Sequence, residues 1–190
     1  MSILKLIKED VDVDIVDHVE RIIETKLELD LNPSEGYKHL GGGAFAEVYD
    51  IMGHKNKVLR IEPEAYNSNL NRIVGEEFKY VVKVFYSTIV ELPEFDDAPI
   101  EITVMEKLDP LPEDVEDEMY KLAKDSDEGL IDPLDIHKVT NKETKKAILH
   151  STKGLKELEG VNIQFEDMHF GNLMYDPKTR NYKIIDLGGF

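Results

Sequence analysis

The chain has 190 residues, no cysteine and a formal net charge of −17, because 40 acidic residues outnumber 23 basic ones. This length allows one compact domain or two small lobes around a buried core. The composition excludes disulfides and membrane-spanning helices, and the charge disfavours contact with nucleic acid or anionic lipid. A cysteine-free chain whose first residues soon turn acidic is expected to lack a signal peptide and to be cytoplasmic.

The first predicted element is an amphipathic helix over residues 13–28, where apolar side chains recur at helical spacing. Asn32-Pro33-Ser34 interrupts the pattern, so residues 1–36 are expected to form a helical extension. Five β-like runs follow, rich in β-branched and aromatic residues, and are expected to form one antiparallel sheet. They cover residues 37–40, 45–52, 57–62, 80–90 and 100–108. Between the third and fourth runs, residues 63–79 predict a short helix or a loop.

After Pro112 the pattern becomes helical. A first helix is predicted around residues 115–122, and an acidic linker over residues 125–129 follows it. A second helix is expected to begin at Thr140, which has capping-box spacing to Glu143, and to end near residue 159. Two short strands and their turn complete the chain, at residues 172–175, 182–185 and 176–178.

A mostly β half followed by a mostly α half predicts an α+β protein. We expect two lobes, over residues 37–108 and 109–190, with a cleft between them. Within them, three segments carry residues suited to phosphate chemistry. In the first, Leu40–Tyr49, glycines let backbone N–H groups approach an anion closely; a plain hairpin turn is the alternative.

The second segment is Lys57–Ile61, in which Val58 and Arg60 share one face of a strand. Such a face would suit a nucleotide, with the apolar side chain beside the nucleobase and the cation towards the phosphates. The alternative is an ordinary strand with one exposed arginine. In the third segment Asp167 and Asn172 bracket a tight loop, and Asp186 ends the strand that pairs with residues 172–175. This hairpin is expected to gather one potential base and two oxygen ligands of the kind that Mg²⁺ takes.

Polar turn residues at strand ends are the alternative for that third segment. His169 within it is expected to brace the loop, and no zinc site is predicted.

In order and spacing, the three segments resemble the eukaryotic-type protein kinase fold over roughly residues 37–188. The motif wording is most similar to kinase-like proteins encoded by bacteriophages, and the catalytic loop has a form shared with small-molecule phosphotransferases. The matching segments are Leu40–Tyr49 (glycine-rich loop, with Ala46 for the third glycine), Lys57–Ile61 (third strand), Thr103–Leu108 (fifth strand and hinge), Asp167–Asn172 (catalytic loop) and Asp186-Leu187-Gly188 (metal-binding DFG motif).

The resemblance implies an ATP- and Mg²⁺-dependent phosphotransferase. Asp167 would orient or deprotonate the acceptor hydroxyl, and Asn172 and Asp186 would hold Mg²⁺ against the β- and γ-phosphates. Glycines of the loop would cover the phosphates, two valines would enclose adenine, and a methionine gatekeeper and the hinge backbone would complete its pocket. The implied nucleotide-binding residues are Gly41, Gly43, Phe45, Val48, Val58, Arg60, Met105, Glu106 and Leu108.

Four features depart from the family. Arg60 stands where the family has lysine, and since its planar guanidinium does not reproduce an ammonium group, we expect reduced or rerouted phosphate binding. The helix-borne glutamate that partners this position is not identifiable among Glu64, Glu76 and Glu77. Phe165-Glu166 replaces the usual His-Arg before the catalytic aspartate. The sequence stops two residues after the DFG-like motif, so we expect a truncated C-terminal lobe without an activation segment.

Three functional hypotheses follow. The first is a serine/threonine kinase-like enzyme that modifies a host protein, in the host cytoplasm if the chain is phage-encoded, or modifies itself. The second is a pseudokinase that binds or inhibits a partner through its acidic surface. The third is a small-molecule kinase. Retention of Asp167, Asn172 and Asp186 favours an enzyme, whereas Arg60 and the truncation favour a binding module. None of the three involves direct contact with nucleic acid or membrane.

Overall fold

The computed structural model describes residues 37–42, 46–51, 54–63, 65, 68–91, 99–124, 136–164 and 169–187. The predicted helix over residues 13–28 and the acidic linker over residues 125–129 lie outside the described residues. The chain divides into a first unit, Met1–Tyr66 with Val84–Lys107, and a second unit, Asn67–Lys83 with Leu108–Phe190. In the parts of the chain that the structure describes, no helix is long and apolar enough to cross a membrane.

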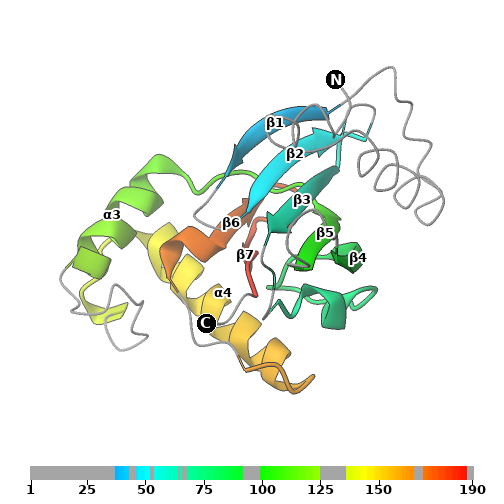
Figure 1. The fold of residues 1–190 in the computed structure, drawn as a ribbon. Helices are drawn as coiled ribbons and strands as arrows, with labels where there is room; N and C mark the ends of the chain where they lie inside the picture. Colours follow the sequence, from blue (N-terminus) through cyan, green and yellow to red (C-terminus); the bar gives the residue numbers. More distant parts are fainter. Residues whose placement is uncertain are drawn as a thin grey trace. The chain divides into compact units, whose positions relative to one another are not determined.

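The first unit contains one five-stranded antiparallel sheet with the order β1-β2-β3-β5-β4 (Figure 1). The predicted α+β class and the predicted five-stranded antiparallel sheet are therefore confirmed. The strands are β1 (Tyr37–Gly42), β2 (Glu47–Ile51), β3 (Lys57–Pro63), β4 (Val84–Glu91) and β5 (Pro99–Glu106).

Alternation of side chains gives the sheet one apolar face and one mixed face. Leu59 lies opposite Val104, and Ile61 lies opposite Ile102, so their side chains share the apolar face. All four of these side chains are buried, and Leu59 is 0% exposed. Complete burial of one such side chain contributes about 1.5–3 kcal/mol to stability, so this face supplies the core of the first unit.

The predicted fourth strand begins four residues too early. Residues 80–83 belong to the second unit, where Val81 forms a parallel bridge with Ile184. The N–H group of Val82 donates to the carbonyl of Ile184 at 2.8 Å, and the N–H group of Ile184 donates to the carbonyl of Tyr80 at 3.0 Å. The β-branched composition was read correctly, but these residues pair with a different partner from the one expected.

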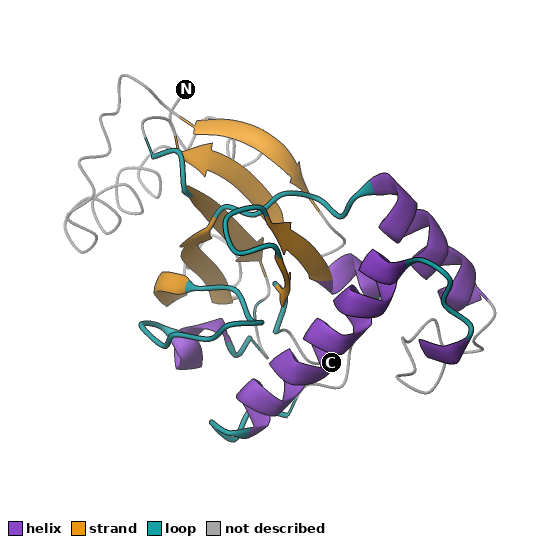
Figure 2. Ribbon diagram, turned by 180° about the vertical axis from the view of Figure 1, so that it is seen from behind, coloured by secondary structure: helices purple, strands orange, loops and turns teal. Residues whose placement is uncertain are grey.

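The described residues of the second unit form two α-helices, a β-hairpin and two 3₁₀ turns (Figure 2). The helix α4 packs against the hairpin: Nδ1 of His150 accepts the N–H group of Tyr182 at 3.1 Å. A Cβ on Gly154 of α4 would lie 2.8 Å from the carbonyl oxygen of Tyr80, so glycine permits this close approach. The elements are η1 (Leu70–Ile73), α3 (Glu113–Lys124), α4 (Lys142–Glu159), η4 (Phe170–Asn172), β6 (Leu173–Asp176) and β7 (Asn181–Ile184).

The capping residue of α4 differs from the predicted one. Thr140 is not the N-cap; the side chain of Asn141 accepts the N–H group of Glu143 at 2.8 Å instead. Thr140 is occupied elsewhere, because its hydroxyl donates to Oε1 of Glu118 on α3 at 2.7 Å. The N-cap of α4 therefore lies one residue later than predicted, and the predicted Thr140 takes part in a contact with α3 instead.

Candidate functional site

The β6–β7 hairpin brings two of the three predicted catalytic residues together. Leu173 pairs with Ile184, and one step further the N–H group of Ile185 donates to the carbonyl of Asn172 at 3.0 Å. Asn172 therefore lies opposite Ile185, and Asp186 directly follows Ile185, so both residues lie at the same end of the hairpin. The predicted base, Asp167, lies outside the described residues.

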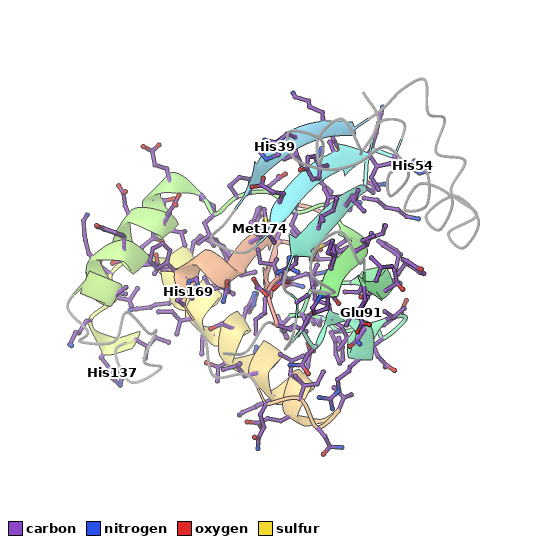
Figure 3. All side chains as sticks on the ribbon, viewed as in Figure 1. His39, His54, Glu91, His137, His169 and Met174 are labelled. Carbon is purple, nitrogen blue, oxygen red and sulfur yellow. The ribbon has the colours of Figure 1, made fainter. Side chains whose placement is uncertain are left out.

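Asn172 is held in a tight turn and is only 7% exposed. Its N–H group donates to the carbonyl of His169 at 3.1 Å, while Nδ1 of His169 accepts the N–H group of Gly171 at 3.1 Å. His169, which is labelled in Figure 3, thus braces the loop, as the sequence predicted. A Cβ at position 171 would lie 2.8 Å from the His169 ring, so this bracing requires a glycine there.

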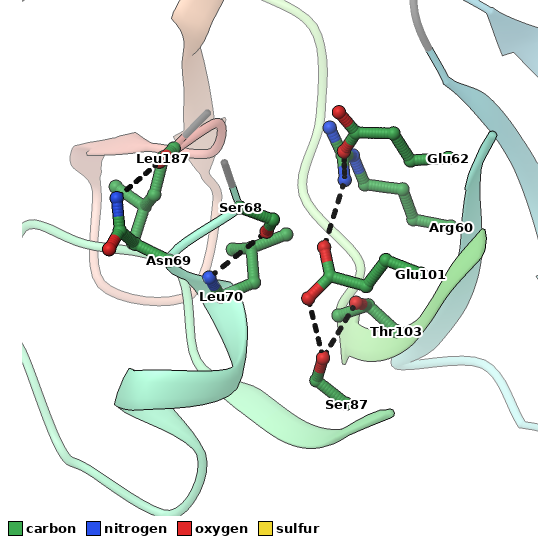
Figure 4. Close-up of polar contacts among 9 residues, drawn as sticks. All are labelled: Arg60, Glu62, Ser68, Asn69, Leu70, Ser87, Glu101, Thr103 and Leu187. Atoms are coloured by element: carbon green, nitrogen blue, oxygen red, sulfur yellow. Dashed lines mark hydrogen bonds and ion pairs between the residues drawn. The ribbon is translucent and has the colours of Figure 1, made fainter. Parts of the chain in front are cut away.

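Asp186 follows directly on β7 and is half-buried. The backbone on both sides of it is held by hydrogen bonds. On one side Ile185 bonds to Asn172, and on the other the carboxamide of Asn69 donates to the carbonyl of Leu187 at 3.2 Å (Figure 4). Leu187 itself is 0% exposed. The position of the Asp186 backbone is therefore fixed by burial and by hydrogen bonds.

The donor set at this hairpin end suits a hard cation. One carboxylate and one carboxamide oxygen match the ligands of Mg²⁺, which keeps several water molecules and needs only one or two protein carboxylates. Within the described residues no three His, Asp or Glu side chains form a group that could hold a metal ion. The labelled histidines are also separated within each unit: His39 from His54, and His137 from His169 (Figure 3). The carboxylate and the carboxamide at the hairpin end thus fit Mg²⁺.

The sheet of the first unit gathers five predicted nucleotide-binding residues. Gly41 lies opposite Val48, Val48 lies opposite Arg60, and Val58 lies opposite Met105. Since directly paired residues share a face and alternate residues on one strand do too, all five positions belong to the mixed face of the sheet. Val58 is 6% exposed and Met105 is 5% exposed.

The remaining predicted nucleotide-binding residues are less closely grouped. Glu106 is the half-buried last residue of β5, and Leu108 is buried but belongs to the second unit. Gly43 and Phe45 lie outside the described residues.

Arg60 is buried rather than exposed, and its guanidinium group faces two carboxylates of the sheet (Figure 4). Glu62 accepts a hydrogen bond from Nη1 of Arg60, and Oε2 of Glu101 lies 3.7 Å from the same nitrogen. The hydroxyl of Ser87 donates to Oε1 of Glu101 at 2.7 Å. The charge of Arg60 is therefore compensated within the sheet, and the ordinary strand with one exposed arginine is ruled out.

Sequence reasoning missed Glu62 and Glu101 as the partners of Arg60. A signal was present for Glu62, which follows Arg60 by two residues on a strand and therefore shares its face. Glu101 stands between Ile100 and Ile102 in an otherwise apolar run, and a charge in a buried strand requires a partner. Of the glutamates considered instead, Glu77 pairs with Lys83 at 2.7 Å, and Glu64 lies outside the described residues.

Comparison of the sequence with protein-family models and with curated proteins found no match. The kinase resemblance therefore depends on the motifs of this chain. Most of the predicted site residues that the structure describes lie in two groups: on the mixed face of the sheet in the first unit, and at the hairpin end with Asn172 and Asp186 in the second.

Proposed function

We propose that the chain is an ATP- and Mg²⁺-dependent phosphotransferase with a two-lobed, kinase-like fold. The observation that carries the proposal is the hydrogen bond from the N–H group of Ile185 to the carbonyl of Asn172, which holds the backbone of Asn172 against the residue that precedes Asp186. Phosphoryl transfer needs mainly positioning and charge neutralisation, and a carboxylate beside a carboxamide provides ligands for the cation that phosphates require.

Each residue has a defined task in this proposal. Asn172 and Asp186 hold Mg²⁺, which when bound offsets the negative charge of the phosphates. Asp167 accepts or orients the proton of the acceptor hydroxyl. Val58 and Met105, which are paired across β3 and β5, support an adenine site on the mixed face of the sheet. The acceptor is a serine or threonine hydroxyl of another protein or of the chain itself.

A second function is favoured by one observation, the ion pairs of Arg60. An arginine held by Glu62 and Glu101 has less charge to offer a phosphate than a free cation at that position would have. The corresponding alternative is a binding module that keeps the kinase-like fold without catalysis. Such a module would use its net charge of −17 to dock on a basic partner.

A transfer assay distinguishes the two functions. The protein is incubated with ATP labelled at the γ-phosphate, Mg²⁺ and a cell lysate, and label on protein is measured together with the thermal shift caused by ATP and Mg²⁺. Asp186→Ala should reduce transfer at least about 100-fold, since several kcal/mol of charge stabilisation are lost. Asp117→Ala, which removes an exposed aspartate of α3, is the matched control and should leave transfer unchanged.

The outcomes separate the hypotheses. Transfer that is lost in Asp186→Ala and kept in the control supports the enzyme. A thermal shift with nucleotide but no transfer supports the binding module. The absence of both transfer and thermal shift would remove the nucleotide proposal altogether.

A further inference from the structure

A cluster of cationic and aromatic side chains lies between α4 and the residues around it in the second unit. Lys146, His150 and Lys153 follow one another on α4 at spacings of four and three residues, so they share one face of the helix. Lys79 reaches the same place from the segment before β4: its Nζ lies 5.2 Å from the centre of the Tyr80 ring. These four residues are called the lysine–histidine cluster below.

His150 is the buried centre of the cluster, with 8% of its surface exposed. Its ring lies 4.5 Å from the ring of Tyr80 and 6.1 Å from that of Tyr182, measured between centroids. Burial lowers the pKa of His150 to about 4, and the charges of Lys146, Lys153 and Lys79 contribute to the decrease. The imidazole is therefore neutral at pH 7 and carries a single proton.

The position of that proton follows from the backbone. Nδ1 of His150 accepts the N–H group of Tyr182, so the proton must be on Nε2. Within the part of the chain that the structure describes, no acceptor lies within hydrogen-bond distance of this N–H group. Nε2 is not one of the fully buried polar atoms that lack a partner, so its N–H group reaches the solvent, where a ligand can accept from it. Nε2 is thus a donor for which the described residues supply no partner.

Two of the lysines are also without a counter-ion. Nζ of Lys153 lies 5.2 Å from the centre of the Tyr80 ring, the same distance as Nζ of Lys79. Neither nitrogen has a carboxylate within 4.0 Å among the described residues. The two ammonium groups therefore converge on one tyrosine ring, although the chain as a whole carries a net charge of −17.

The carboxylates nearest to the cluster are occupied. Glu143 of α4 accepts from Nζ of Lys146 at 3.3 Å and from the hydroxyl of Tyr182 at 3.2 Å. The two oxygens of Glu157 accept the backbone N–H groups of Lys79 and Tyr80, at 3.2 and 2.9 Å. Three lysines thus face two glutamates, and the local charge is positive.

We propose that the lysine–histidine cluster binds a phosphate group, with the ammonium groups of Lys79 and Lys153 and the Nε2–H group of His150 as donors. A dianionic phosphate offers several strong acceptors at once and gains from more than one cation. Both lysines are exposed, and each ammonium group sits on a flexible four-carbon stem with rotatable donors, so both can turn towards one phosphate. The bound group is a free phosphate or the phosphate of a phosphorylated side chain.

This site is independent of the proposed phosphotransferase activity, because it shares no residue with the Asn172–Asp186 pair. The test uses the full chain with ¹⁵N-labelled histidine in phosphate-free buffer. Inorganic phosphate and a phosphoserine peptide are titrated separately, and the ring resonances of His150 are followed by NMR. Binding should shift them in a saturable way and raise the pKa of His150, because a nearby dianion stabilises the imidazolium.

Two double variants with the same change in charge complete the test. Lys79→Gln with Lys153→Gln should weaken phosphate binding at least about tenfold, since two charge-assisted hydrogen bonds are lost. Lys55→Gln with Lys121→Gln, at exposed lysines of a turn and of α3, should leave it unchanged. Asp186→Ala should also keep the His150 response, which separates this site from the proposed nucleotide site.

The results decide between the sources of the phosphate and can reject the site. Tighter binding of the phosphopeptide than of inorganic phosphate assigns the site to phosphorylated protein, and equal affinity assigns it to small anions. Failure of both ligands to shift His150, or an equal loss of affinity in the two double variants, would overturn the proposal.

Discussion

Arg60 is a buried charged side chain in the sheet of the first unit. A guanidinium group that is 5% exposed would be unfavourable by itself, because burial removes the water that solvates its charge. Glu62 and Glu101 replace that solvation, and Ser87 satisfies a further oxygen of Glu101. The group behaves as a unit, so the loss of one charge leaves the others without compensation.

Replacing Arg60 should therefore destabilise the protein strongly. Arg60→Met keeps much of the side-chain volume but removes the cation that faces Glu62 and the fully buried Glu101, and we expect a loss of about 3–5 kcal/mol in the free energy of unfolding. Chemical denaturation monitored by circular dichroism measures it. The double variant Arg60→Met with Glu101→Gln should be less destabilised than the sum of the two single variants. Strict additivity would show that the two side chains do not interact.

The sequence predicted the strand and the face of Arg60 but not its burial or its partners. Strand periodicity specifies which residues share a face, and this was enough to place Val58 and Arg60 together. The pairing of Arg60 with Thr103, and hence the approach of Glu101, depends on which strands become neighbours. That choice is made by long-range packing, which a single sequence does not display.

At the level of elements, periodicity and turn residues located the five strands, the β6–β7 hairpin and both described helices. The errors occurred at element ends, where a long-range contact overrides the local preference. Residues 80–83 bond to β7 rather than continue β4, and Thr140 bonds to Glu118 rather than cap α4. Glu118 is the more informative case, because its carboxylate on α3 receives donors from the start of α4.

Glu118 should stabilise the contact between α3 and α4 in a pH-dependent way. Burial alone would raise its pKa, but hydrogen bonds from Thr140 and Asn141 outweigh this effect and lower the pKa from 4.5 to about 2. The folded state therefore holds the proton less tightly than the unfolded state. The stabilisation is fully present above pH 4.5 and is lost as the pH falls towards 2.

A comparison of Glu118→Gln with the original protein tests this. At pH 7 the variant should be less stable by about 1–2 kcal/mol, a typical effect for hydrogen bonds to a charged group. The difference should shrink between pH 4.5 and 2, as measured by urea denaturation at several pH values. Glu116→Gln, at an exposed position of the same helix, is the control and should show little difference at any pH. A gap between Glu118→Gln and the original protein that stays constant with pH would contradict the assignment.

For the whole molecule, the net charge of −17 is the dominant property. Like charges repel more strongly in the compact state than in the expanded one, and salt weakens this repulsion over a distance of about 10 Å at 0.1 M ionic strength. The exposed residues of α3 contribute to the excess, since its first turn contains Glu113, Asp114 and Glu116.

Stability should therefore increase with ionic strength. Between about 10 and 150 mM sodium chloride we expect a gain near 1 kcal/mol, or roughly 2–4 °C in Tm for a chain of this size. Differential scanning calorimetry at several salt concentrations measures it. Glu116→Gln with Asp117→Asn should reduce the dependence on salt, whereas Lys121→Gln should increase it. A Tm that does not change with salt would show that self-repulsion is unimportant here.

The division of the chain between its two units has a consequence for how it can be cut. The second unit takes Asn67–Lys83 from between β3 and β4, and binds it through Val81, Val82 and the carboxamide of Asn69. No single cleavage point separates the two units, because each consists of two stretches of polypeptide. A fragment ending at Lys107 would retain the whole sheet, yet it would also carry an orphaned apolar strip at residues 80–82. Because the two units alternate along the chain, neither can be produced alone from one continuous segment, and we expect them to fold together.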